Sequence, residues 1–153
     1  MTADELTALG RRAVACEGWR WLPGMLGWRP DNHGVPHPIR FVEGVESMEA
    51  LAGTGAGPLL ASGYATCDGY WRSDDIMPDL TDPATLGCLL ALVREAWGDP
   101  RLVAIYCEAV YPGQSEGWAV QTADNRLPVA GEGHGSEAEA LVAALEAASV
   151  LGG

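Results

Sequence analysis

The sequence predicts an α+β fold, a single compact domain over residues 1–153 in which about three helices pack on a largely antiparallel sheet of about four to six strands. Two segments, 83–97 and 137–149, combine helical spacing of apolar residues with capping signals. Between and after them lie short segments rich in β-branched and aromatic residues, bounded by glycine, proline and aspartate. The 153 residues, 48% of them hydrophobic, suffice for one core of ordinary size.

Helices are predicted at both ends of the chain. Thr2 and Glu5 have the spacing of a capping box, and an apolar repeat follows them. Ser136 and Glu139 have the same spacing ahead of an alanine-rich segment, which predicts the last helix over 137–149.

The central helix, 83–97, is the best defined element of the sequence. Asp82 can accept hydrogen bonds from the free N–H groups of the first turn, and Pro83 suits the first helical position. Gly98 and the proline that follows it end the helix. One side carries an apolar stripe that predicts burial, formed by Leu86, Leu89, Leu90, Val93 and Trp97.

The strands are predicted from shorter patterns. Residues 39–42 and 59–66 read as extended segments. The apolar run 102–111 is typical of an interior strand and is expected in the middle of the sheet. Trp118, Val120 and Thr122 occupy alternate positions, and 127–130 return after a turn, which predicts a hairpin.

The composition restricts the class of partner. The formal net charge of −12 disfavours direct binding to nucleic acid or to anionic lipid, and favours a partner with a basic surface. None of the basic residues is lysine, so Schiff-base chemistry and a P-loop lysine are excluded.

The sequence also predicts where the protein acts. No apolar run approaches the roughly 20 residues that span a bilayer, and the charged N-terminal segment is unlike a signal peptide. We therefore expect the protein in the cytoplasm of the cell that makes it, without a membrane partner. Four widely spaced cysteines without a CxxC pair are expected to be free thiols.

One motif resembles that of a hydrolase. Residues 113–117 read G-x-S-x-G, and Asp124 and His134 follow Ser115 in the chain order of α/β-hydrolases. A nucleophile elbow requires a helix directly after the serine, whereas 118–122 has the pattern of a strand. A hairpin loop is the preferred interpretation, and no catalytic residue is predicted.

Metal and cofactor sites are not predicted either. Asp31, His33 and His37 could converge on zinc, but the intervening glycine and prolines prevent the helix that would align the two histidines. The glycines in 53–57 superficially resemble a phosphate loop, yet no helix follows them.

The candidate site is a protein-interaction surface. The chain has 6 tryptophans, and tryptophan is a frequent binding hot spot. Trp28 and Trp71 lie beside loops and near charged residues. With the acidic cluster before the central helix, they give these predicted interaction residues: Trp28, Trp71, Asp74, Asp75 and Asp79.

Three blocks in this order carry a resemblance: ACEGWRWLPGM at 15–25, MPDLTDPATLGCLLALVREAWGDP at 77–100, and GEG at 131–133 before the last helix. Together they resemble small uncharacterised proteins of bacteriophages and prophages from GC-rich hosts. The resemblance implies a phage origin in the cytoplasm of a bacterial host and an α-β-α sandwich. Together with the acidic charge, it motivates the hypothesis of a non-enzymatic accessory protein that binds a host or defence protein, in the manner of an anti-CRISPR inhibitor. The alternatives are a structural or assembly component of a phage particle or complex, whose partner would be another phage protein, and a small hydrolase or metal-dependent enzyme using Ser115 or the histidines.

Overall fold

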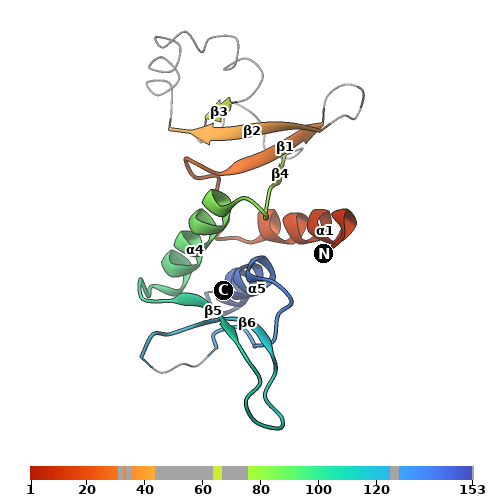
Figure 1. The fold of residues 1–153 in the computed structure, drawn as a ribbon. Coiled ribbons are helices and arrows are strands. Elements are labelled where there is room, and N and C mark those ends of the chain that lie inside the picture. Colours follow the sequence, from red (N-terminus) through yellow and green to blue (C-terminus); the bar gives the residue numbers. More distant parts are fainter. Residues whose placement is uncertain (31–32, 34–35, 44–63, 67–75, 125–127, 153) are drawn as a thin grey trace. The chain divides into compact units, whose positions relative to one another are not determined.

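The computed structural model describes residues 1–30, 33, 36–43, 64–66, 76–124 and 128–152 (Figure 1). Within these residues, three helices and two small sheets confirm the α+β class and the predicted number of helices. The elements in chain order are α1 (Ala3–Ala15), β1 (Leu26–Pro30), β2 (Pro36–Val42), β3 (Tyr64–Thr66), β4 (Met77–Pro78), α4 (Pro83–Trp97), β5 (Val103–Cys107), β6 (Gly117–Gln121) and α5 (Glu137–Leu151).

The chain divides into two compact units. The first unit contains Met1–Trp19 and Leu86–Gly153, and the second unit contains Arg20–Thr85. The boundary falls in the first turn of α4. The single compact domain expected from the sequence stays a prediction.

The second unit is built on a four-stranded sheet with the order β3-β2-β1-β4. The β1–β2 and β1–β4 pairs are antiparallel, and β2–β3 is parallel. The predicted segment 39–42 lies in β2, and of the predicted strand 59–66 the described part is β3. The rings of Trp21 and Phe41 stack at 4.1 Å between centroids. The buried side chains among the described residues of this unit include Trp21, Met25, Ile39, Phe41, Ile76, Leu80 and Thr85.

The start of α4 is fixed by a polar network in the second unit. The Oδ2 atom of Asp82 accepts from the backbone N–H of Thr85 at 2.9 Å, which confirms the predicted cap. The same carboxylate pairs with Arg40 of β2 at 2.8 Å. The hydroxyl of Thr85 donates to Asp82 at 2.9 Å and accepts from the backbone N–H of Leu26 at 2.8 Å. The helix is thereby tied to two strands of the sheet.

The first unit has its core along α5. This helix packs against β6, β5 and α1. The predicted capping box of Thr2 and Glu5 is present at α1. At α5, Ser136 accepts from the N–H of Glu139, but the Glu139 carboxylate reaches back to the N–H of Gly135. The fully buried apolar side chains of this unit include Ala13, Leu89, Val93, Leu141, Val142, Ala144 and Leu145.

The strands of the first unit correct two predictions. They form a two-stranded sheet of their own, so the strands are divided between two sheets rather than joined in one. The expectation that 102–111 lies mid-sheet is wrong, because only 103–107 is a strand and its one strand partner among the described residues is β6. The second strand predicted at 127–130 is reduced to an isolated β-bridge between Gln121 and Pro128. The backbone N–H of Val129 also donates a hydrogen bond to the Val120 carbonyl.

None of the helices in the described parts of the chain is long and apolar enough to span a bilayer.

Candidate interaction surface

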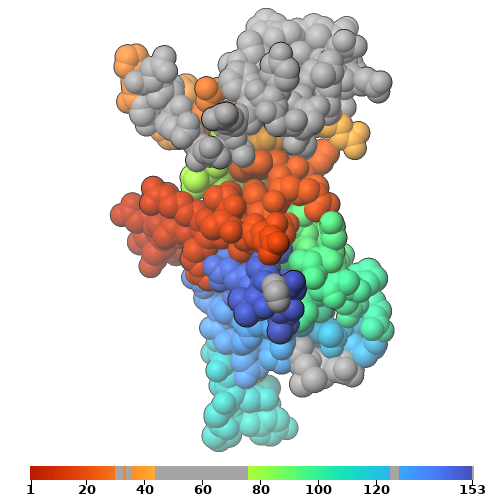
Figure 2. Space-filling model, turned by 180° about the vertical axis from the view of Figure 1, so that it is seen from behind, coloured from red at the N-terminus to blue at the C-terminus, as the bar shows by residue number. Residues whose placement is uncertain are grey.

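The loop that joins β5 to β6 projects from the rest of the first unit (Figures 1 and 2). Three apolar or aromatic side chains are exposed on this hairpin: Tyr106 at 49%, Val110 at 70% and Tyr111 at 69%. Residues 102–124 contain no lysine or arginine, and the exposed Glu108 and Glu116 belong to the hairpin. We call the set of Tyr106, Glu108, Val110, Tyr111 and Glu116 the hairpin surface.

Tyr106 is held in place from two sides. Its ring meets that of Trp118 edge-on, with 6.0 Å between centroids. Its hydroxyl donates to Oε1 of Glu116 at 2.6 Å. This hydrogen bond is the main cause that raises the pKa of Tyr106 above its ordinary value. Tyr106 therefore presents an apolar face with a fixed orientation, which suits a binding anchor.

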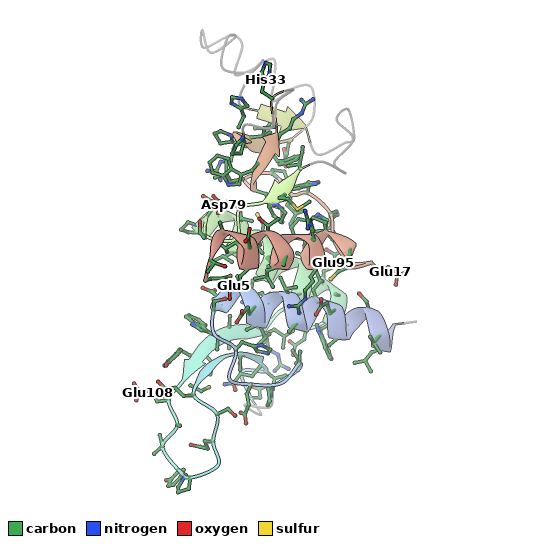
Figure 3. All side chains as sticks on the ribbon, turned by 90° about the vertical axis from the view of Figure 1, so that its right-hand side faces the viewer. Glu5, Glu17, His33, Asp79, Glu95 and Glu108 are labelled. Atoms are coloured by element: carbon green, nitrogen blue, oxygen red, sulfur yellow. The ribbon has the colours of Figure 1, made fainter. Side chains whose placement is uncertain are left out.

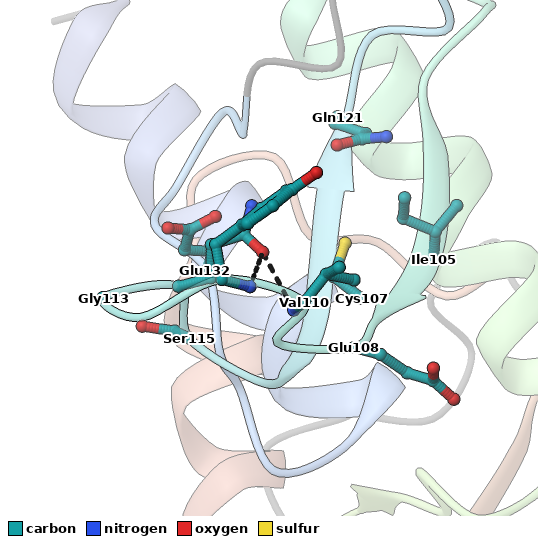
Figure 4. Close-up of a pocket in the computed structure, with 10 residues that line it drawn as sticks. Ile105, Cys107, Glu108, Val110, Gly113, Ser115, Gln121 and Glu132 are labelled. Carbon is teal, nitrogen blue, oxygen red and sulfur yellow. Dashed lines mark hydrogen bonds between the residues drawn. The ribbon is translucent and has the colours of Figure 1, made fainter.

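A hollow of about 710 Å³ borders the hairpin (Figure 4). Gln114 shapes its loop, because the amide oxygen of Gln114 accepts from the N–H groups of Val110 at 3.0 Å and of Tyr111 at 3.1 Å. Of the described residues, two with carboxylates line the hollow and none with a basic side chain does. The lining residues are Ile105, Cys107, Glu108, Val110, Tyr111, Gly113, Gln114, Ser115, Gln121 and Glu132.

The residues of the hydrolase-like motif are engaged separately. Ser115 lies in the hairpin loop, and β6 begins at Gly117, so the hairpin-loop interpretation is confirmed. Asp124 pairs with Arg101, and the Nε2 atom of His134 lies 3.1 Å from the carbonyl oxygen of Ala130. The side-chain interactions of His134 and Asp124 thus go to Ala130 and Arg101, and neither goes to Ser115.

The histidines considered for zinc are placed differently from each other. His37 lies in β2, where it is exposed, and His33 is exposed in a turn. Asp31 and the glycines of 53–57 lie outside the described residues. Across the described ranges, no three histidine, cysteine, aspartate or glutamate side chains cluster so as to hold a metal ion.

Two of the predicted interaction residues lie together in the second unit. The indole N–H of Trp28 donates to Oδ2 of Asp79 at 3.1 Å, and Trp28 is 37% exposed. The Oδ1 atom of Asp79 accepts from the N–H and hydroxyl of Thr81. The indole N–H of Trp28 and the carboxylate oxygens of Asp79 therefore form hydrogen bonds within this unit. Trp71, Asp74 and Asp75 lie outside the described residues, and their role stays a prediction.

The hairpin surface is the set that sequence reasoning missed. Its apolar residues belong to the run 102–111, whose composition indicates a buried strand. A signal was available, because a glutamate interrupts this run at 108 and a Pro-Gly pair at 112–113 marks a turn immediately after Tyr111.

Comparison of the chain with protein-family models, with curated protein sequences and with solved structures gives no match.

The thiols provide a first test of burial in the first unit. Cys16 is 9% exposed and its Sγ donates to the carbonyl of Arg12, and burial is the main cause that raises its pKa to about 11. At pH 7.5 about one Cys16 in three thousand would be a thiolate. We expect N-ethylmaleimide to leave Cys16 unmodified in the folded protein while Cys107, beside the hollow, is labelled. Peptide mapping by mass spectrometry checks this, and equal labelling of both cysteines would contradict it.

Proposed function

We propose that this protein acts without catalysis, by binding a partner protein with a basic surface through the hairpin surface. One observation carries the proposal: three exposed apolar or aromatic side chains lie on a hairpin whose only charged residues are carboxylates. Exposed apolar groups with a polar rim are typical of protein-binding sites.

The charge of the chain supports a basic partner. The net charge of −12 steers association toward positive surfaces and disfavours nucleic acid. Tyr106 and Tyr111 provide large contact areas at small cost in side-chain entropy, whereas Glu108 and Glu116 would select against acidic competitors.

The resemblance to small bacteriophage and prophage proteins suggests which partner to seek. A host or defence protein in the bacterial cytoplasm, inhibited in the manner of an anti-CRISPR protein, is the class we propose. A basic groove that normally holds nucleic acid would match both the charge and the aromatic anchors.

The test is capture of partners from host lysate by the tagged protein and by two double variants. Val110→Ser/Tyr111→Ser removes exposed apolar groups from the hairpin surface. Val150→Ser/Leu151→Ser is the matched control, because these residues are 81% and 71% exposed at the end of α5. We expect one stoichiometric partner with the wild type and the control, and a loss of about tenfold or more with the hairpin variant.

Repeating the capture at increasing salt concentrations adds a second criterion. Capture should weaken as ionic strength rises, since attraction between exposed charges is screened. Capture that is equal for both double variants would contradict the proposal. Recovery of the bait alone would do so too, and would favour the assembly-component alternative if the bait self-associates.

A further inference from the structure

One edge of β5 is not paired with any strand in the described parts of the chain. In the antiparallel β5–β6 pair, Tyr106 is opposite Trp118 and Ala104 is opposite Val120. Trp118 exchanges both backbone hydrogen bonds with His134, at 2.8 and 3.0 Å, and the Val120 carbonyl accepts from Val129. These bonds point away from β5.

The direction of the backbone N–H and C=O groups of β5 follows from this register. Residues in a non-hydrogen-bonded pair direct their N–H and C=O groups away from each other's strand. Ala104 and Tyr106 therefore direct theirs to the outer edge of β5, where no described residue bonds to them. At Leu102, just before the strand, the carbonyl oxygen is instead satisfied by Nε of Arg94 at 2.9 Å. The open edge thus begins at Ala104.

Natural proteins protect such edges with lysine, proline, bulges or a covering element, because an open edge pairs with other strands. Lysine and proline are both missing from Val103–Cys107, and the exposed Tyr106 adds an apolar surface to the edge. An edge left open in this way is suited to β-strand addition.

The hollow lies on one face of the same strand. Ile105 and Cys107 line it (Figure 4), whereas the side chain of Tyr106, which contacts Trp118, is on the opposite face of the strand. A strand added to β5 directs alternate side chains toward the side where the hollow lies. Glu108 and Glu132 line this hollow without a basic neighbour among the described lining residues, so a basic side chain would complement it.

We propose that the outer edge of β5 takes up an extended basic segment of the partner protein as an added antiparallel or parallel strand, with an arginine or lysine side chain in the hollow beside Glu108 and Glu132. This inference rests on the proposed function and specifies its mode of recognition. A second copy of this chain is the less favoured occupant, because each copy carries a net charge of −12.

The backbone part of the proposal is tested with synthetic peptides. The probe is an acetylated and amidated octapeptide that alternates arginine and valine, with a fluorophore for anisotropy. In one version every arginine is N-methylated, and in the other every valine is N-methylated. An added strand uses the N–H groups of alternate residues only. We therefore expect one version to lose affinity by about tenfold or more and the other to stay within about threefold of the parent.

Variants of the protein test the same edge. Ala104→Pro removes an outward N–H while leaving the bonds to β6 intact, and Ala104→Val keeps that N–H as the matched control. Binding should be lost with the proline and kept with the valine, and circular dichroism checks that both variants fold. Glu108→Gln/Glu132→Gln should weaken binding about tenfold, whereas Glu17→Gln, an exposed carboxylate after α1 (Figure 3), should have no effect.

The outcomes separate the two proposals. If the hairpin double variant abolishes partner capture but Ala104→Pro does not, the binding surface stands and strand addition is overturned. Absence of peptide binding at low salt, or equal effects of the two methylation patterns, also overturns it. Sedimentation equilibrium that shows a dimer dispersed by Ala104→Pro would assign the edge to a second copy and overturn the basic segment.

Discussion

Replacing Gly117 with alanine is expected to destabilise the protein by about 2 to 5 kcal/mol. Gly117 has a φ angle of +142°, a backbone conformation that residues with a side chain rarely adopt. A Cβ atom at this position would lie 2.6 Å from the carbonyl oxygen of His134 and 2.7 Å from the carbonyl carbon of Gly133. Both are backbone atoms, so relief requires that the 131–134 segment move away from β6.

The matched control for this prediction is Gly113→Ala. Gly113 also has a positive φ, of +91°, but no atom lies within 4 Å of the Cβ position. It should cost about 1 to 2 kcal/mol, from the backbone conformation alone. Urea unfolding of both variants measures the difference, which isolates the steric term. Equal destabilisation would show that the close approach of Gly117 to His134 does not constrain the fold.

Gly117 also illustrates why the motif at 113–117 misleads. The sequence pattern G-x-S-x-G suggests a nucleophile elbow, whereas in the structure its last glycine allows the segment before α5 to approach β6 closely. The contact joins residues that are distant in the chain, so the spacing of glycines within the motif carries no information about it. The local signal, strand alternation after the serine, predicted the hairpin loop correctly.

The central helix was predictable because its determinants are local. Asp82, Pro83 and Gly98 lie at its ends, and the structure places the helix at Pro83–Trp97. The contacts of its first turn were not predictable from the sequence. They are made by Arg40 of β2 and Leu26 of β1, which are distant from the helix in the chain. The prediction that 102–111 lies in the middle of a sheet was wrong for the same reason. The composition of this segment indicates β structure but not how many strands pair with it.

Replacing Asp82 with alanine is the second large effect that we expect, at about 2 to 4 kcal/mol. The change removes the cap of α4 and the ion-pair partner of Arg40, whose side chain is 35% exposed and keeps its hydrogen bond to the Gly24 carbonyl at 2.7 Å. It also removes the closer acceptor of the buried Thr85 hydroxyl, which is left with the Leu26 carbonyl oxygen at 3.5 Å. Urea unfolding measures the loss, and a loss below about 1 kcal/mol would contradict the role of this network.

Asp82→Asn separates the cap from the charge, because asparagine caps helices about as well as aspartate. The bond with Arg40 is the main cause that lowers the pKa of Asp82 from its ordinary value of 3.8. As pH falls, the unfolded chain therefore protonates first, and the stabilisation by Asp82 is present above pH 3.8 and is lost as pH falls through the lower folded pKa. The stability difference between wild type and Asp82→Asn should shrink from about pH 6 to about pH 3 in urea titrations. A difference close to zero at every pH would indicate that the cap, which asparagine preserves, accounts for the contribution of this carboxylate rather than the ion pair with Arg40.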